Sequence, residues 1–515
     1  MISLKKMTAF LLAATMIAFA GCSSSNTQSS LEDASGAKAS NISQENTTVK
    51  IALGSEPDNL DPMLSAATDT SSVMMNVFEG LLGFNEKGEF IPAIAESYTI
   101  SADELTYTFQ IKKGIQFHDG KDCTAKDVKY TYEKLAGLSG SEALNSTLAA
   151  ELVKVDTPDD DTVVMTLKAK DAGFLSKATI SIVEKDYDAN STKPIGTGPY
   201  RFVEYTKGQK IILQKNDNYS TMEDRKPTVN QVEFVIMTDE NAKLMALKSG
   251  SLDIAGISSS NASALGSDFT IVKGPQNMVQ IFALNNQVKE LSNLKVRQAI
   301  SYAIDKDEII QSVVDGNGTK VESFLSPSMA TYYNDKISAY ETNIDKAKEL
   351  LKEAGYENGF DLTIKVPSNY QTHVDTAQVI KSQLAKIGVN VNIQLIEWAQ
   401  WLDGVYTNRD YEATIIGHSG KLDPQDFLNR FSSTYAKNYF NFSNSAYDAL
   451  ITKGATTADE EARAEIYKQC QQMLVDQAAS VFIQDPSIIF AVSNRVSGLK
   501  IYPVTFFNLS DLKVQ

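Results

Sequence analysis

The sequence has little of what metal sites, nucleic-acid binding and membrane spans require. Three cysteines and three histidines in 515 residues leave little room for a metal site built from several Cys and His ligands. Positive charge is scarce, because 48 Lys and Arg stand against 64 Asp and Glu, for a net charge of −16 at pH 7. Nucleic-acid binding needs a basic surface, so the composition argues against it. A mean hydropathy of −0.21 excludes a polytopic membrane protein.

The common enzyme motifs are also missing. The sequence contains no HExxH zinc motif, no Walker A loop and no GxGxxG dinucleotide motif. Residues 417–420 start like a nucleophile elbow, but Lys421 stands where the final glycine belongs. His118 and Asp119 are adjacent, as a base and its orienting acid would be, yet they lie in a turn, where a structural hydrogen bond is the better interpretation. The sequence therefore predicts no enzyme, no cofactor and no metal.

The N-terminal segment has the pattern of an export signal. Lys5 and Lys6 precede an apolar run over 7–18, which is too short to span a bilayer comfortably. Small residues then lead into Cys22, which resembles the lipobox of bacterial lipoproteins, although Phe19 stands where Leu is more usual. We expect cleavage before Cys22 and a lipid on its thiol. The alternatives are an ordinary signal peptide or a buried helix.

Residues 22–48 are rich in Ser, Asn, Thr and Gln and almost free of aliphatic side chains. Such a segment cannot bury enough apolar surface to offset its ordering entropy, so it is predicted to be a flexible tether. The folded body then begins near residue 49, outside the cytoplasm, where Cys123 and Cys470 are able to pair. Cys470 shares a helical stripe with apolar neighbours, however, which favours two buried thiols.

Strand and helix patterns alternate along the rest of the chain. Residues 105–111 alternate apolar and polar side chains, as a half-buried strand does. Asp345 is predicted to cap a helix that runs to residue 354, with Gly355 as its stop. A second helix over 373–387 ends at a glycine and is followed at once by an alternating strand over 389–395. The order helix, glycine, strand is typical of an α/β layer.

Five short motifs occur in order along this body. They are KGIQFHDG at 113–120, GTGPY at 196–200, LKSGSLDI at 247–254, VRQAI at 296–300 and AGY at 354–356. Together they resemble the family 5 extracellular solute-binding proteins, the dipeptide- and oligopeptide-binding components of ABC importers. The resemblance implies an α/β, two-lobed periplasmic-binding-protein-like fold (type II, cluster C-like) with an extra inserted domain.

The same resemblance implies a division of the chain into parts. These are a signal peptide at 1–21, a lipidated cysteine and tether at 22–48, domain I at 49–73, 192–276 and 486–515, domain II at 74–191, and domain III at 277–485. Crossovers near 276 and 485 are expected to form a hinge, so that a ligand is enclosed between the lobes by hinge closure. Binding then shifts the balance between open and closed states, and no bond is made or broken.

The resemblance also implies a ligand site around 417–424. In peptide-binding members, an aspartate that precedes an Asp-Pro motif pairs with the ammonium group of the peptide. Here that position holds Lys421, the earlier aromatic position holds His418 followed by Ser419, and one residue is missing before Asp423. A cation beside a ligand ammonium costs several kcal/mol at an effective dielectric constant of about 20. Either Lys421 binds an acidic ligand group, or it faces solvent while Asp423 does the pairing, or Asp423 only caps a helix.

Four further residues complete the candidate ligand site. Trp398 and Trp401 are the only tryptophans and are able to stack on peptide planes or sugar rings, although their spacing also suits a shared core face. Thr68 lies in a stretch that corresponds in the family to a cleft edge with backbone pairing. Asn285 stands where the chain leaves the hinge, and it either bonds the ligand or satisfies the crossover.

The function implied is that of a lipid-anchored receptor that captures short peptides and delivers them to the permease of an ABC transporter and its ATPases. We expect a monomer on the outer face of the bacterial cytoplasmic membrane, in the periplasm if the host has an outer membrane. The alternative is the same role for a non-peptide or N-blocked solute, such as an acidic opine-like compound or an oligosaccharide, which Lys421 favours. A sensor with the same fold stays open, and a secreted hydrolase is disfavoured.

Overall fold

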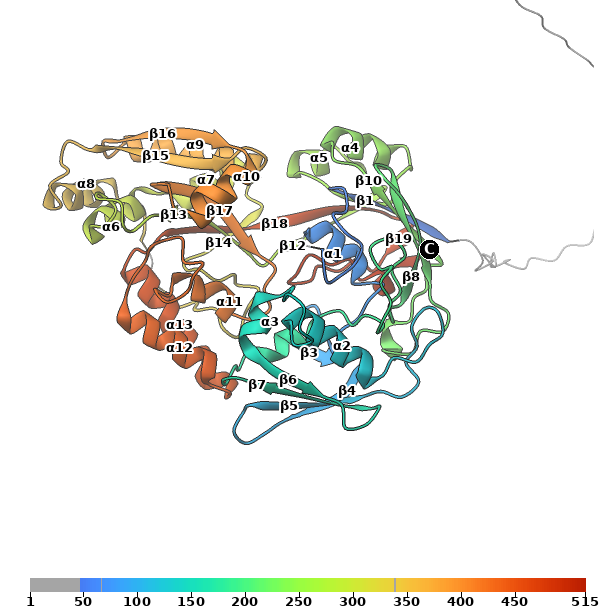
Figure 1. Ribbon diagram of the computed structural model, residues 1–515. Coiled ribbons are helices and arrows are strands. Elements are labelled where there is room, and N and C mark those ends of the chain that lie inside the picture. The colour runs from blue at the N-terminus through green and yellow to red at the C-terminus, as the bar shows by residue number, and fades with distance from the viewer. Residues whose placement is uncertain (1–46, 66, 338–339) are drawn as a thin grey trace, which may run out of the picture. The chain divides into compact units, whose positions relative to one another are not determined.

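The largest sheet joins strands from both ends of the chain. The computed structural model describes residues 47–65, 67–337 and 340–515. In these ranges the sheet has 12 strands, with the path β16-β15-β17-β13-β18-β11-β1-β10-β9-β8 and with β12 and β14 paired to β18 (Figure 1). One half holds β1 (Thr48–Leu53), β8 (Tyr200–Thr206), β9 (Lys210–Lys215), β10 (Gln231–Ile236), β11 (Ile254–Gly256) and β12 (Phe269–Pro275). The other holds β13 (Met278–Leu284), β14 (Gly318–Lys320), β15 (Phe360–Pro367), β16 (Val389–Ile396) and β17 (Ala413–Ser419).

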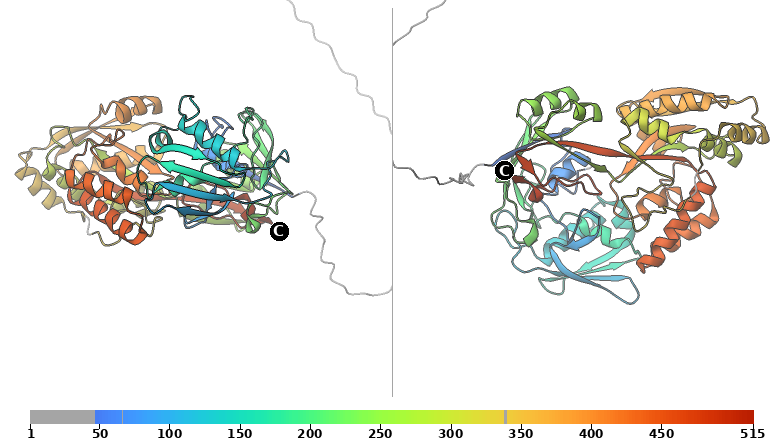
Figure 2. Two further views of the ribbon diagram at one scale, coloured as in Figure 1. Left: turned by 60° about the horizontal axis from the view of Figure 1, so that its bottom comes forward. Right: turned by 180° about the vertical axis from the view of Figure 1, so that it is seen from behind.

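Strand β18 (Val481–Ser493) connects the two halves. Its first residues pair with β13, whereas the residues from Ser487 onward pair with β12. The strand therefore runs through both halves, as the front and back views show (Figures 1 and 2). We call residues 47–276 with 486–515 lobe A, and residues 277–485 lobe B. The chain crosses between the lobes next to Asn277 and Asp485. The boundaries of the three domains that were proposed from the sequence stay a prediction.

Lobe A also carries a smaller antiparallel sheet with the order β4-β5-β7-β6. Its strands are β4 (Ala95–Ile100), β5 (Thr106–Ile111), β6 (Leu152–Asp156) and β7 (Thr162–Leu167). Every second side chain of β5 is buried, which confirms the predicted half-buried strand. Helices α2 (Ala125–Ala136) and α3 (Ser146–Glu151) and the 3-10 helix Phe174–Thr179 pack on this sheet around one hydrophobic core.

Lobe B has a hydrophobic cluster on each face of its half-sheet. Because successive strand side chains point to opposite faces, Ile281 enters one cluster and Phe282 the other. The second cluster is covered by helices α6 (Leu294–Ala303), α7 (Lys306–Val314), α8 (Ile344–Glu353) and α9 (Gln371–Ala385). The first is rich in aromatic rings and is covered by helices α11 (Gln425–Leu428), α12 (Ser445–Thr456) and α13 (Glu460–Asp476).

The predicted succession of helix, glycine and strand in lobe B is confirmed. Helix α9 ends at Ala385, and β16 begins at Val389. Gly388 has a φ of +83°, a left-handed conformation that favours glycine. Helix α8 likewise ends just before Gly355, whose φ is also +83°. Both helix stops thus follow from the backbone conformation of a glycine, although α9 ends two residues earlier than predicted. The predicted cap at Asp345 is wrong, because α8 begins at Ile344 and the side chain of Asn343 caps it by accepting a hydrogen bond from the backbone N–H of Lys346.

The remaining elements are short. They are α1 (Thr68–Met74), β2 (Leu82–Phe84), β3 (Phe90–Pro92), α4 (Glu240–Lys248), α5 (Ser259–Ser263), α10 (Trp398–Gln400), the π-helix Trp401–Thr407, β19 (Val496–Ser497), β20 (Lys513–Val514) and the 3-10 helices Glu223–Arg225, Asn429–Phe431 and Leu509–Asp511. None of the described helices is long and apolar enough to cross a membrane. The predicted signal peptide, Cys22 and the tether up to residue 46 lie outside the described residues.

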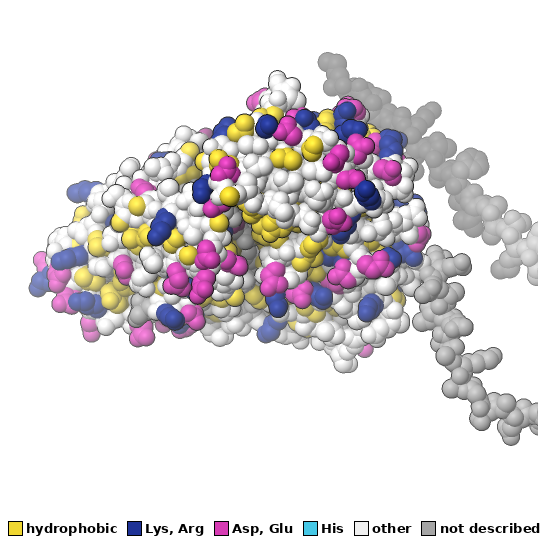
Figure 3. Space-filling view, turned by 90° about the horizontal axis from the view of Figure 1, so that it is seen from below, with side chains coloured by type: hydrophobic (Ala, Val, Ile, Leu, Met, Phe, Trp, Pro, Cys, Tyr) yellow, Lys and Arg dark blue, Asp and Glu magenta, His cyan; other side chains and the backbone are white. Residues whose placement is uncertain are grey.

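The two cysteines of the described body are buried free thiols, as the sequence predicts. Cys123 lies in the core under the small sheet, and Cys470 lies in the aromatic cluster of lobe B. Burial raises the pKa of both thiols. Acidic and basic side chains are interspersed on the face that Figure 3 shows.

Candidate functional site

A cavity of about 530 Å³ lies between the lobes. Its volume falls in the range of about 300–1,000 Å³ that is usual for small-molecule sites. Lobe A contributes Thr68, Ser71, Asn145, Ser176 and Lys177, and lobe B contributes Ser419, Gly420, Lys421 and Asp426. A depression of about 610 Å³ on the small sheet of lobe A contains none of the candidate residues. The interlobe cavity is therefore the candidate ligand site, and it includes Thr68, Ser419 and Lys421 from the sequence-based set.

Lys421 lines the cavity from lobe B. Its side chain is partly buried, and within the described residues its ammonium group forms no ion pair or hydrogen bond. Its backbone carbonyl accepts a 2.6 Å hydrogen bond from the side-chain amide of Asn277, at the crossing between the lobes. Burial lowers the pKa of the Lys421 ammonium, and Arg430 and Lys177 lower it further against the opposing effect of Asp426. A cation withdrawn from water without a counter-ion is unfavourable, so this position favours an anionic ligand group.

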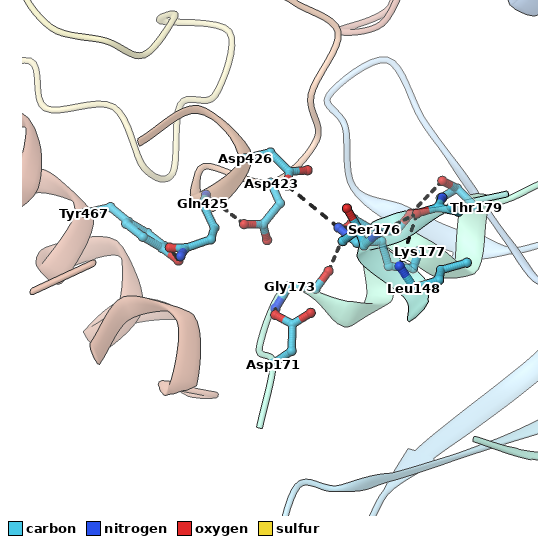
Figure 4. Close-up of polar contacts among 12 residues, drawn as sticks. Leu148, Asp171, Gly173, Ser176, Lys177, Thr179, Asp423, Gln425, Asp426 and Tyr467 are labelled. Carbon is cyan, nitrogen blue, oxygen red and sulfur yellow. Dashed lines mark hydrogen bonds and ion pairs between the residues drawn. The ribbon is translucent and has the colours of Figure 1, made fainter. Parts of the chain in front are cut away.

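Lys177 faces the same cavity from lobe A. Its Nζ lies 3.8 Å from Oδ1 of Asp426 in lobe B, and only 17% of the lysine side chain is exposed (Figure 4). Burial opposes the charge on Lys177, but the carboxylates of Asp426, Glu151 and Asp171 outweigh it and raise its pKa. The ion pair bridges the lobes, together with a 2.8 Å hydrogen bond from the backbone N–H of Ala172 to the carbonyl of Ala455.

Asp423 does not line the cavity, and its carboxylate pairs within lobe B while it lies against Gly173 of lobe A. Its carboxylate oxygens accept hydrogen bonds of 2.8 and 3.0 Å from the guanidinium group of Arg463, and both side chains are less than a tenth exposed. Its Oδ1 also accepts a 2.8 Å hydrogen bond from the backbone N–H of Gln425, at the start of α11. The N-cap of α11 is Pro424, so Asp423 is not the helix cap that the sequence allowed, and its carboxylate lies in the turn before the helix. The structure adds a buried bidentate ion pair that the sequence did not indicate.

His418 and Ser419 end strand β17 and have different surroundings. Nε2 of His418 lies 2.8 Å from the hydroxyl of Tyr439, and its ring packs edge-on against Phe324 at 5.3 Å. Burial lowers the pKa of His418 well below its usual value, so the ring is neutral at pH 7. His418 is absent from the cavity lining, whereas the exposed Ser419 belongs to it. The structure thus gives His418 a packing role behind the cavity.

The tryptophans share a core face, which is the second of the two interpretations that the sequence allowed. Trp401 is 2% exposed, and its indole N–H donates a 2.9 Å hydrogen bond to Thr414. Trp398 stacks on it with a centroid distance of 5.1 Å and an interplanar angle of 4°, and Tyr370 covers Trp398 edge-on. Neither indole is among the residues that line the interlobe cavity.

Asn285 satisfies the backbone where β13 ends. Its side-chain N–H groups donate to the carbonyls of Tyr411 and Arg409, and its Oδ1 accepts from Asn441 and from the backbone of Gln287. Its side chain is buried and is absent from the cavity lining. All of its partners lie in lobe B, at the opposite end of β13 from the crossing next to Asn277, so the structure shows neither of the two roles that the sequence left open.

Two of the sequence motifs are joined by hydrogen bonds of His118 in lobe A. Nε2 of His118 lies 2.9 Å from the carbonyl of Gly198, and its Nδ1 accepts a hydrogen bond from the backbone N–H of Gly196. Burial lowers the pKa of His118 to about 4, so the ring is neutral. The predicted structural hydrogen bond of this histidine is confirmed, and it joins the motif at 113–120 to the motif at 196–200.

Sequence reasoning missed Lys177 and Asp426. Lys177 had no detectable signal, because it lies in the 3-10 helix Phe174–Thr179 of lobe A and meets lobe B only through the tertiary fold. Asp426 lies in the first turn of α11 and lines the cavity. A search for charged residues near the Asp-Pro motif would have found it.

The comparison with known proteins identifies the family. Residues 89–439 match the family described as bacterial extracellular solute-binding proteins, family 5 Middle. The chain belongs to this family. The heme-binding protein A of Haemophilus influenzae is 30% identical to it, over 96% of each chain. The predicted two-lobed α/β fold of the family 5 solute-binding proteins is thereby confirmed.

Two solved structures of the same fold contain different ligands. One is the ABC transporter-associated periplasmic binding protein DppA from Helicobacter pylori in complex with peptide STSA, which is 27% identical with a TM-score of 0.78 over 91% of this chain and 98% of that chain. The other is the binding protein AgaA from A. tumefaciens R10 in complex with agropinic acid, which is 29% identical with a TM-score of 0.76 over 91% of this chain and 99% of that chain. The family fold thus serves both a peptide and a non-peptide acid.

Proposed function

We propose that this family 5 solute-binding protein is a lipid-anchored receptor that captures short peptides outside the cell and delivers them to the permease of an ABC importer. The observation that carries the proposal is the interlobe cavity of about 530 Å³, whose lining groups come from both lobes. A ligand that contacts both walls favours the closed state, because it gains interactions there that the open state lacks. The peptide complex of the Helicobacter pylori relative supports a peptide as the cargo.

Identification of the bound solute tests this function. The full chain is purified in detergent and examined by native mass spectrometry, and whatever is released on denaturation is then identified. A ladder of masses that resolves into short peptides is the expected result. Added peptides should also raise the melting temperature in a saturable way without being consumed. Turnover of the peptide, or complete indifference to peptides, would contradict the proposal.

A second candidate is the same receptor role for a non-peptide or N-blocked acid. Lys421 favours it, because its ammonium group lines the cavity without an ion-pair partner in the described residues. The agropinic acid complex of the AgaA relative supports it as well. A single non-peptide or N-blocked mass in the same experiment would select this candidate over short peptides.

The proposed lipid anchor depends on the thiol of Cys22. We expect Cys22→Ser to release the protein from the membrane fraction into the soluble fraction, because a serine hydroxyl replaces the thiol that carries the lipid. The measurement is fractionation of cells followed by immunoblotting, with Ser24→Ala as the control for a substitution in the same segment. Detergent-dependent membrane association of the Cys22→Ser variant would contradict the anchor.

A further inference from the structure

The segment of lobe B that borders the cavity carries an excess of cations without partners. Lys421, Arg430 and Lys437 form no ion pair among the described residues, and the Arg430 guanidinium donates to the hydroxyl of Tyr406 at 3.1 Å. In addition to burial, Arg430, Lys177 and Lys437 lower the pKa of the Lys421 ammonium, whereas Asp426 raises it. Four cations therefore lie near this part of the cavity, and Asp426 is the one carboxylate among the described residues that line it.

The carboxylates on the side of Lys177 do not cancel this excess. Asp423 is neutralised by Arg463 inside lobe B, and burial raises the pKa of Glu151 to about 7, so much of its charge is lost at neutral pH. Burial also raises the pKa of Asp171, whose oxygen accepts a 2.9 Å hydrogen bond from Gly173. Asp426 alone among these carboxylates lines the cavity.

Both cavity lysines are also poorly satisfied as hydrogen-bond donors. The Lys177 ammonium has a 3.4 Å contact to the hydroxyl of Ser176 and lies 3.8 Å from Asp426, which is too far for a good hydrogen bond. The Lys421 ammonium has no hydrogen-bond partner among the described residues. An ammonium group offers three donors, and partly buried donors without acceptors are unfavourable. A ligand oxygen in the cavity would supply the missing acceptors.

We infer that an anionic group of the ligand, a carboxylate, binds at Lys421 and is enclosed from lobe A by Lys177. The two lysines repel each other in the empty cavity, and a carboxylate between them replaces this repulsion by two charge-assisted interactions. The anion thereby favours closure of the lobes. The hydrogen bond from Asn277 to the backbone of Lys421 fixes this anion site relative to the chain crossing. The inference rests on the proposed receptor function and specifies the ligand as an acid.

The test uses chemically blocked ligands. Randomised tripeptide libraries with free termini, with an N-acetyl group and with a C-terminal amide are each titrated by calorimetry into the full chain, and glutarate, citrate and gluconate serve as non-peptide acids. We expect the free and N-acetyl libraries to bind and the amide library to bind at least tenfold more weakly. Binding of the non-peptide acids alone supports the same anion site with the second candidate function.

Variants assign this preference to the two lysines. Lys421→Gln and Lys177→Gln should each weaken binding of the acids at least tenfold and reduce the difference between acid and amide, whereas Lys421→Arg should keep the difference. Lys348→Gln is the matched control, because it removes the same charge from an exposed position outside the cavity lining. The melting temperature without ligand shows whether each variant folds. If Lys421→Gln does not fold, Lys177→Gln is used to test the anion site.

Three results would overturn the inference. Equal binding of the acid and amide libraries would leave the receptor function intact but remove the anion site. A tenfold loss for Asp426→Asn with free but not N-acetyl peptides, with no loss for Lys421→Gln, would assign the cavity to the ligand ammonium instead. Failure of every peptide and every acid to bind would contradict both the receptor function and the anion site.

Discussion

The interior of the protein and the wall of the cavity use the same kinds of side chain differently. In the interior, Asp423 and Arg463 form a bidentate ion pair that is almost completely buried. On the wall, Lys177 and Asp426 approach only to 3.8 Å, and Lys421 has no ion-pair partner in the described residues. Both charges of the interior pair have their counter-ion within the protein, whereas the charges on the wall have a distant counter-ion or none among the described residues. Charges that the fold has satisfied stabilise lobe B, and charges that it has left unsatisfied are available to a ligand.

The largest effect is expected from breaking the interior pair. Asp423→Ala leaves the Arg463 guanidinium buried without its counter-ion, which should lower the free energy of unfolding by about 3–5 kcal/mol. Asp426→Ala is the matched control and should change it by less than about 1 kcal/mol, because the wall pair is long and more exposed. Urea unfolding followed by circular dichroism measures both. Equal losses in the two variants would erase the distinction between interior and wall.

A smaller effect on stability is expected from substitutions of the two stacked tryptophans. Trp401→Phe removes the hydrogen bond to Thr414 and part of the stack with Trp398, so we expect a loss of about 2 kcal/mol. Trp398→Phe, at the more exposed ring, should cost less than about 1 kcal/mol. Neither variant should change ligand affinity, since neither indole lines the cavity. A loss of ligand affinity at unchanged stability would contradict the core role of the tryptophans and assign them to the ligand site.

A methyl group added to Gly173, at the contact between the lobes, should make closure of the lobes less favourable. A Cβ on Gly173 would lie 2.8 Å from Oδ2 of Asp423, which cannot yield because Arg463 holds it. Gly173→Ala should therefore weaken ligand binding roughly tenfold at nearly unchanged stability, because overpacking costs about 1–3 kcal/mol in the closed state alone. Gly266→Ala, where the added methyl meets open space, is the control. Titration calorimetry measures the affinity, and an unchanged affinity would refute a closed-state contact.

The smallest effect expected is a pH dependence, because Glu151 is only partly buried and solvent screens its charge. Burial, with Asp171 and Asp426 nearby, raises the pKa of Glu151 from 4.5 to about 7. The folded protein thus holds a proton that the unfolded chain releases, so stability falls as pH rises from about 4.5 to about 7. Glu151→Gln stays neutral and should flatten this part of the profile, unlike the exposed control Glu142→Gln. Melting temperatures across this range measure it, and parallel profiles of Glu151→Gln and wild type would disprove the shift.

The sequence predicted the parts of this protein that depend on local chemistry. The half-buried strand that ends at Ile111, the helix stops at Gly355 and Gly388 and the buried thiols all follow from periodicity, backbone freedom and apolar neighbours. The sequence also placed Lys421 in the ligand region by its position before an Asp-Pro motif. It left the roles of Asp423, Trp398 and Asn285 open, because burial and partners are not visible in a linear pattern.

Periodicity, turn residues and ordered motifs by themselves determined the α/β class, the family and the segment that carries Lys421. Only the tertiary structure decided that Asp423 turns inward to Arg463, that both tryptophans join the core, and that Lys177 meets Asp426 across the cavity. The physical reason is the range of the interactions. Strand alternation and helix stops act over a few residues, whereas the ion pair between residues 177 and 426 exists only after the chain has crossed from one lobe to the other and folded back against the first.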